Sequence, residues 1–139
     1  MNNLTRLFAY IDANKNTPFE WGKFDCCLFA ANAIKVATGS DIAADFRGKY
    51  NTARGAKKAL KRYGNGDLIS TVIAKLGDAK PPLQAKRGDL VLVDNLQGGV
   101  NDPALGICLG HLVAVTTQTG LKTVELTRVT MAWEVLCHQ

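Results

Sequence analysis

Apolar positions in the first half of the chain recur at the spacing of helices. Near the N-terminus four apolar residues stand at i, i+3, i+4 and i+7, which predicts a helix with Asn3 as its N-cap. Two later segments are each followed by a glycine, and Asp67 stands at the cap position of the second of them. The three predicted helices cover residues 4–11, 52–63 and 68–76.

The segment from Cys26 to about Thr38 is apolar almost all the way round. Asp25 precedes it at the N-cap position, and Gly39 follows it at the position where helices commonly end. A helix without a polar face is buried on several sides. We therefore expect this helix to be the central one of the domain.

After Pro81-Pro82 the pattern changes to short apolar runs divided by turn residues, which predicts strands. Helices followed by strands with short connections are typical of an α+β protein. The length of 139 residues fits one domain over residues 1–139, with a C-terminal antiparallel sheet of about five strands. The predicted strands are 89–93, 105–109, 112–117, 121–126 and 131–136.

The net charge of +5 raises the question of a nucleic-acid partner. Much of this charge lies between Arg47 and Arg62, but a nucleic-acid surface usually adds exposed aromatic side chains or a glycine-rich loop. Here Ala53, Ala56, Leu60 and Tyr63 recur at helical spacing, so the basic residues form the polar face of an amphipathic helix. We expect that face to be solvated, or else to dock an acidic protein, and do not expect a nucleic-acid partner.

The longest apolar stretch, residues 26–37, is interrupted by Lys35, and residues 1–6 are polar. The sequence therefore predicts neither a membrane span nor a signal peptide. Since nothing indicates secretion, we expect reduced cysteines.

Adjacent Cys26 and Cys27 on a helix point about 100° apart, and no C-x-x-C spacing occurs. The sequence therefore predicts no cofactor and no metal site within this chain. A metal site shared between subunits stays open.

Cys26 is the candidate nucleophile. A thiol in the first turn of a helix lies near unpaired backbone N–H groups and the positive end of the helix dipole, and both favour the thiolate. Asp25 is interpreted as an N-cap rather than a catalytic acid, and Cys108 as a core residue. Trp21 and Trp133 are interpreted as packing anchors rather than ligand platforms.

Several short motifs resemble the NlpC-type cysteine peptidases, which have a papain-like fold. They are Trp21-Gly22, Asp25-Cys26 at the head of a buried helix, and the runs 87–93 and 105–110. The resemblance implies that the cysteine after Asp heads the helix that packs on the sheet. It also implies a catalytic histidine directly before the second run, where this chain has Ala104, and an orienting polar residue near Thr116.

Over nearly its whole length the chain also resembles a group of small phage proteins. The shared features are the Phe-x-Trp-Gly opening, Asp25-Cys26 and the segments 39–41, 47–50 and 132–135. This resemblance implies a component of a phage tail tip, or baseplate, with other tail-tip proteins as partners. The implied location is the virion tail tip, after assembly in the cytoplasm of the bacterial host.

The missing histidine decides between the functions considered. Thiol proteolysis needs a base, which alanine cannot supply. The chain has two histidines, His111 and His138, and His138 is next to last, where chains commonly fray. We therefore expect a structural tail-tip component on a degenerate peptidase scaffold, with Cys26 kept in place.

Two other functions stay open. The first is an active thiol hydrolase that cuts peptides of host peptidoglycan during DNA entry, with Cys26 as nucleophile and His111 as base. It requires a strand register that brings His111 to the cysteine, rather than leaving it in a turn. The second is a nucleic-acid or scaffold-binding module that uses the basic face. The connection 94–103 either covers the site or contacts a neighbouring subunit.

Overall fold

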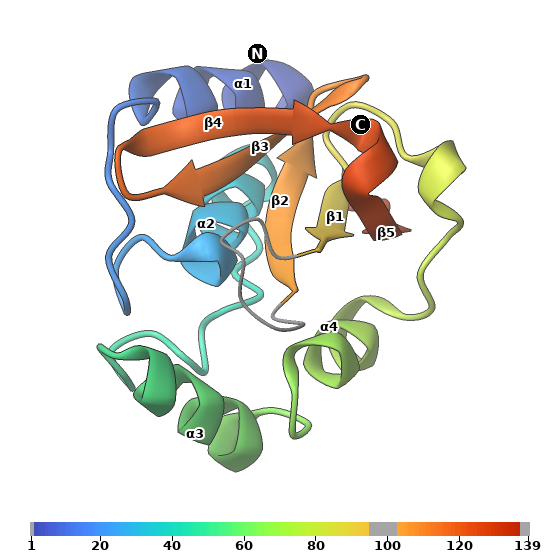
Figure 1. Cartoon of the computed structure of the whole chain (residues 1–139). Coiled ribbons are helices and arrows are strands. Elements are labelled where there is room, and N and C mark those ends of the chain that lie inside the picture. Colours follow the sequence, from blue (N-terminus) through green and yellow to red (C-terminus); the bar gives the residue numbers. More distant parts are fainter. Residues whose placement is uncertain (1, 95–102, 137–139) are drawn as a thin grey trace.

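The computed structural model describes residues 2–94 and 103–136, and in this part four α-helices precede a five-stranded antiparallel sheet (Figure 1). The α+β class predicted from the residue pattern is therefore confirmed. The helices are α1 (Asn3–Ala13), α2 (Cys26–Thr38), α3 (Ala53–Tyr63) and α4 (Leu68–Leu76), with 3-10 turns η1 (Pro82–Gln84) and η2 (Leu126–Arg128). The strands are β1 (Leu90–Val93), β2 (Ala104–Cys108), β3 (Leu112–Thr117), β4 (Gly120–Glu125) and β5 (Val129–Trp133).

The helix ends follow their capping residues. The Asp67 carboxylate accepts a hydrogen bond from the Ser70 N–H at 2.7 Å, and α2 ends at Gly39, whose φ of 84° is left-handed. The predicted cap of the first helix was wrong by one residue. Asn2 is the cap, because its side chain accepts the Thr5 N–H at 2.8 Å, and the chain is already helical at the next residue.

Strands β1 to β4 form a meander, and β5 returns to the free edge of β1, giving the order β4-β3-β2-β1-β5. The fifth strand spans Val129–Trp133 rather than the predicted 131–136. Its limits are set by its partner, because Trp133 pairs with Leu90 at the start of β1 and Val129 with Val93 at its end. A short partner strand thus fixes where β5 begins and ends.

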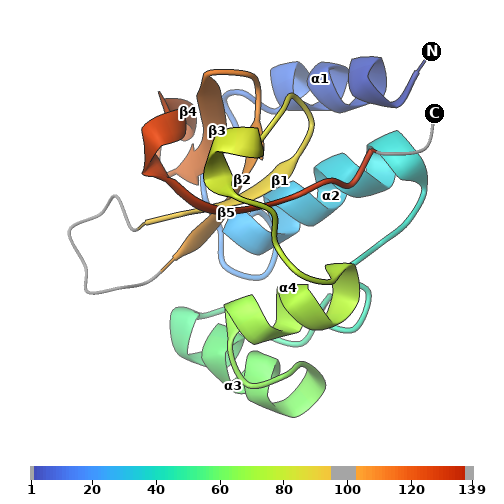
Figure 2. The same cartoon turned by 90° about the vertical axis from the view of Figure 1, so that its right-hand side faces the viewer.

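Helix α2 is the centre of the molecule, as predicted. It packs against α1 and β2, and most of its side chains are buried; Val36, at 44% exposure, is an exception. In both views α1 lies at one end of the molecule, α3 and α4 lie at the other, and α2 runs between them (Figures 1 and 2). The face of the sheet toward α2 carries Leu90, Leu92, Leu105, Ile107 and Ala114.

Helix α3 is amphipathic, and its inner face agrees with the predicted one in part, because Ala56 and Leu60 are half-buried. Its basic side chains are exposed, as expected of a solvated face. Ala59 is its buried residue, whereas Ala53 and Tyr63 are exposed. The Tyr63 ring instead lies under two cations, Lys49 at 5.3 Å and Arg62 at 5.5 Å.

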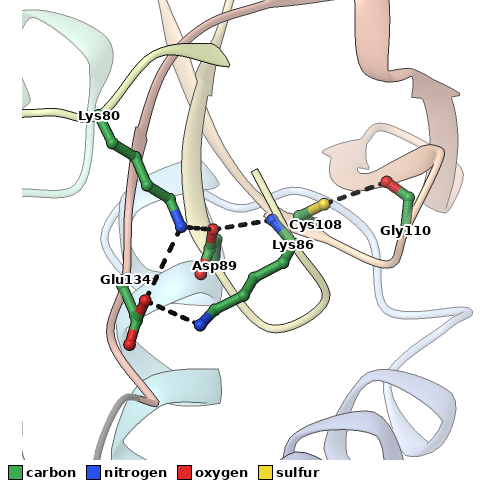
Figure 3. A network of polar contacts seen from close by, with 6 residues as sticks. All are labelled: Lys80, Lys86, Asp89, Cys108, Gly110 and Glu134. Atoms are coloured by element: carbon green, nitrogen blue, oxygen red, sulfur yellow. Dashed lines mark hydrogen bonds and ion pairs between the residues drawn. The ribbon is translucent and has the colours of Figure 1, made fainter. Parts of the chain in front are cut away.

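A polar network ties the start of β1 to the end of the chain (Figure 3). Asp89 is 1% exposed, and its carboxylate lies 2.6 Å from the Lys80 ammonium and accepts the Lys86 backbone N–H at 2.9 Å. Glu134 contacts both lysine ammonium groups, that of Lys80 at 3.9 Å and that of Lys86 at 2.8 Å. The Asp89 carboxylate therefore holds Lys80 and Lys86, and the two lysines extend the network to Glu134.

The remaining packing residues agree with their interpretations. Trp133 is 2% exposed, and its ring N–H donates to the Gly77 carbonyl at 3.0 Å. Cys108 is fully buried on the face of the sheet away from α2. None of the helices in the described ranges has the length and apolarity that a membrane crossing needs.

Candidate functional site

Cys26 is the first residue of α2, and its partly exposed side chain lies at the helix N-terminus. The preceding residue, Asp25, is 1% exposed and organises the whole loop. Its carboxylate accepts three hydrogen bonds, from the Leu28 N–H at 2.9 Å, the Gly22 N–H at 3.0 Å and the Tyr50 hydroxyl at 2.5 Å. The N-cap interpretation of Asp25 is confirmed, and these bonds fix where the Cys26 sulfur stands.

Tyr50 joins the loop after α2 to this cap. Burial, together with the hydrogen bond to the Asp25 carboxylate, raises the pKa of the Tyr50 hydroxyl far above its ordinary value. Tyr50 therefore stays protonated and acts as a donor to Asp25. From the sequence, Tyr50 was noted only as part of the 47–50 segment, and no pattern linked it to Asp25.

The sulfurs of Cys26 and Cys27 lie 3.8 Å apart, although adjacent helix positions are rotated by about 100° about the helix axis. A hydrogen bond from the Cys27 thiol lowers the pKa of Cys26, and the Leu105 backbone N–H adds to this effect, while burial and the Asp25 charge oppose it. The same pairing, with burial, raises the pKa of Cys27 well above its ordinary value. The contact between the two thiols therefore shifts their pKa values in opposite directions, that of Cys26 down and that of Cys27 up.

The sheet is open next to this sulfur. Strands β2 and β3 pair at Ile107↔Ala114 and Cys108↔Val113, and continuing that register sets Leu105 opposite Thr116. The ladder stops before that level, and the Leu105 N–H is directed at Cys26. Within the described residues the Thr116 hydroxyl oxygen is buried and has no hydrogen-bond partner. Thr116, at the position that the resemblance assigns to the residue orienting the histidine, therefore makes no hydrogen bond to a histidine in the described part of the chain.

Ala104 does not present its methyl group to the sulfur. It is the first residue of β2, pairs with Val93 and packs with Val91 and Val93 on the face of the sheet away from α2. Side chains alternate across a strand, so the next residue, Leu105, faces the helix instead. The side chain of β2 that faces α2 at this level is therefore that of Leu105 and not that of Ala104.

The structure does not bring His111 and Cys26 together. His111 is exposed in the turn between β2 and β3, and its carbonyl accepts the Leu126 N–H at 3.1 Å. Leu105, whose backbone N–H is directed at Cys26, is toward the other end of β2, and the strand from Leu105 to Cys108 rises about 10 Å at about 3.3 Å per residue. His138 and Cys137 lie outside the described residues, as does most of the 94–103 connection.

A cavity of about 80 Å³ lies beside the cysteine pair, between α2 and the helices α3 and α4. Cys27 and Leu105 line it on the side of the sulfurs. Trp21 also lines it, with its ring edge-on to Phe19 at a centroid distance of 4.8 Å. Trp21 is thus partly a packing anchor and partly a wall of this cavity, which the residue pattern did not reveal.

Comparison with known proteins agrees with this architecture. A family model described as "Domain of unknown function (DUF6950)" matches residues 2–135. The crystal structure of the NlpC/p60 domain of the peptidoglycan hydrolase SagA superposes with a TM-score of 0.60, over 96% of this chain and 99% of that chain, at 22% identity. A search of curated proteins gives no match. The papain-like, NlpC-type fold expected from the motifs is confirmed.

Proposed function

The chain belongs to the DUF6950 family, and from the geometry of its site we propose that it is a degenerate NlpC/p60 domain with a structural role in a phage tail tip. The carrying observation is that His111, the histidine among the described residues, is exposed in the β2–β3 turn and does not reach the Cys26 sulfur at the head of α2. Within the described residues the site therefore presents a thiol without an imidazole that could accept and return a proton.

Peptide hydrolysis needs that group twice. The leaving amine must be protonated as the C–N bond breaks, and the water that releases the acyl group must be deprotonated. The titratable groups near Cys26 in the described part of the chain include Cys27, whose sulfur lies 3.8 Å away, Asp25 at the N-cap and Tyr50. Asp25 accepts three hydrogen bonds, Tyr50 donates one of them, and the raised pKa of Cys27 does not suit a base at neutral pH.

The tail-tip role follows from resemblance to small phage proteins and is compatible with the preserved cap. Segments 39–41 and 47–50 carry that resemblance, and residues in both make structural contacts. Asp41 pairs with Arg47 at 2.8 Å, and the Tyr50 hydroxyl donates to Asp25. On this proposal the fold of the chain, rather than catalysis, is what the tail tip requires. Its partners are other tail-tip proteins, assembled with it in the host cytoplasm and carried in the virion.

Two measurements test the proposal. Purified chain should release no product from peptidoglycan peptides, with an NlpC/p60 hydrolase as positive control. In a phage that carries this gene, deletion should abolish intact tail tips, whereas Cys26→Ala should leave infectivity near wild type. Peptide turnover that disappears in Cys26→Ala would refute the structural role.

The competing function is a thiol hydrolase acting on host peptidoglycan peptides with Cys26 and His111. The lowered pKa of Cys26 favours it, because a nucleophile needs its thiolate. It requires His111 to leave the β2–β3 turn. If it is correct, His111→Ala and Cys26→Ala should each abolish turnover.

A further inference from the structure

The Cys26 site suits one kind of leaving group. An amine is too basic to leave a tetrahedral carbon without a proton donor, whereas a thiolate, with an ordinary pKa of about 8.5, leaves unaided. Among the described residues the site supplies a sulfur nucleophile at a helix N-terminus, 3.8 Å from a second thiol, and no histidine beside it. It therefore fits an electrophile that is itself a thiol derivative.

The adjoining cavity indicates what that electrophile carries. Polar residues of its lining are already engaged: Asp25 and Tyr50 hydrogen-bond to each other, the Thr71 hydroxyl donates to the Asp67 carbonyl at 2.7 Å, and the Lys75 ammonium pairs with Asp45 at 3.5 Å. A polar ligand would find few free hydrogen-bond partners there, so the cavity suits an alkyl group. By comparison with an apolar cavity of about 150 Å³ that binds benzene, a volume of about 80 Å³ holds about three carbon atoms.

The two features adjoin. Cys27 and Leu105, both of which hydrogen-bond to the Cys26 sulfur, also line the cavity. A chain of three carbons attached through a carbonyl to Cys26 has only to pass the Cys27 sulfur to enter it. The sulfur pair thus stands at the edge of an alkyl-sized space.

We propose that Cys26 accepts a short acyl group from an acyl thioester and that the alkyl end of this group occupies the cavity. The Cys26 thiolate attacks the thioester carbonyl carbon and forms a new C–S bond. The original C–S bond breaks, and the departing sulfur leaves with its electron pair as a thiolate, so neither an oxidant nor an external acid is needed. Because no described group beside Cys26 activates water, the acyl group stays on, and each chain is modified once.

Acylation by thioesters of N-acetylcysteamine tests this proposal on the full chain, followed by intact mass and peptide mapping. One acyl group should appear, on Cys26, and none on that residue in Cys26→Ser. The butanoyl thioester should react about tenfold faster than the acetyl thioester, since two further methylene groups are buried. The dodecanoyl thioester should react more slowly than the butanoyl one, because its chain exceeds the cavity.

Variants of the cavity wall make the test specific. Ala56→Leu places a larger side chain in the cavity and should abolish the butanoyl preference, and its circular dichroism spectrum shows whether the variant is folded. Ala53→Leu makes the same change on the exposed side of the same helix and should keep the preference. Phe46→Leu enlarges the cavity and should shift the preference toward hexanoyl.

Equal rates for acetyl and butanoyl in the wild type, or acylation at Cys27 or Cys108 instead, would overturn the proposal. So would a butanoyl preference that survives Ala56→Leu. These results are separate from those that test the proposed function. That function would be refuted by turnover of peptidoglycan peptides, or by normal tail tips in a phage that lacks the chain.

Discussion

The hydrogen bond from Tyr50 to Asp25 should be a main support of the site, and Tyr50→Phe removes it with little change of shape. Asp25 is 1% exposed, so water does not replace the lost donor, and two backbone N–H groups remain. A hydrogen bond to a charged group contributes about 1.5–3 kcal/mol. We expect Tyr50→Phe to lower the free energy of unfolding by about 2 kcal/mol.

Thermal unfolding followed by circular dichroism measures this effect. A chain of 139 residues has an unfolding entropy of about 0.3 kcal/mol per kelvin, so the midpoint should fall by about 7 °C. Tyr63→Phe is the matched control, because Tyr63 is 39% exposed and its ring, rather than its hydroxyl, contacts Lys49 and Arg62. Equal midpoints for the two variants would show that the Asp25 cap does not depend on Tyr50.

Three further predictions concern the thiol, the loop before it and the buried ion pair. Because the pKa of Cys26 is lowered, iodoacetamide should alkylate Cys26 at neutral pH faster than it alkylates a cysteine in an unfolded peptide. As the pH falls, the rate should decline only below the ordinary cysteine pKa of about 8.5. A pH–rate curve identical to that of the peptide would contradict the lowered pKa. Gly22→Ala should destabilise the protein by more than about 2 kcal/mol in urea unfolding, since φ is +82° and a Cβ atom would overlap with the Tyr50 carbonyl oxygen. A loss below about 1 kcal/mol would mean that the backbone relaxes freely around the new methyl group. Lys80→Met leaves the buried Asp89 carboxylate without its 2.6 Å partner and should lower the free energy of unfolding by about 2–3 kcal/mol. The control Lys15→Met breaks an exposed ion pair and should lower it by less than about 0.5 kcal/mol. Similar losses of stability for both variants would argue against a special role of the buried pair.

Local rules determined most of the elements. Asp25, Asp67 and the glycines after the helices mark real boundaries, because capping depends on side-chain and backbone groups only a few residues apart. The apolar circumference of Cys26–Thr38 likewise identified the central helix. These features depend on contacts within one segment, so the sequence displays them directly.

Features that depend on pairing between segments were misplaced or not visible. The limits of β5 were wrong by two residues at its start and three at its end, since the short β1 decides how far its partner extends. The side of the sheet on which Ala104 lies follows from the alternation of side chains along β2. The residue pattern predicted that this strand begins at Leu105, one residue later than it does. The apolar face assigned to α3 included Tyr63, which in the structure meets cations at the surface.

The chemistry of the site divides in the same way. The sequence by itself placed a cysteine behind a capping aspartate and showed that no histidine stands before the second strand run. Only the tertiary structure brought the Leu105 N–H to the Cys26 sulfur, the Cys27 sulfur to 3.8 Å and the Tyr50 hydroxyl to Asp25, and enclosed a cavity beside them. The physical reason is that a thiol's pKa and a cavity's volume are sums over neighbours from distant segments, and a linear pattern holds no distances between such segments.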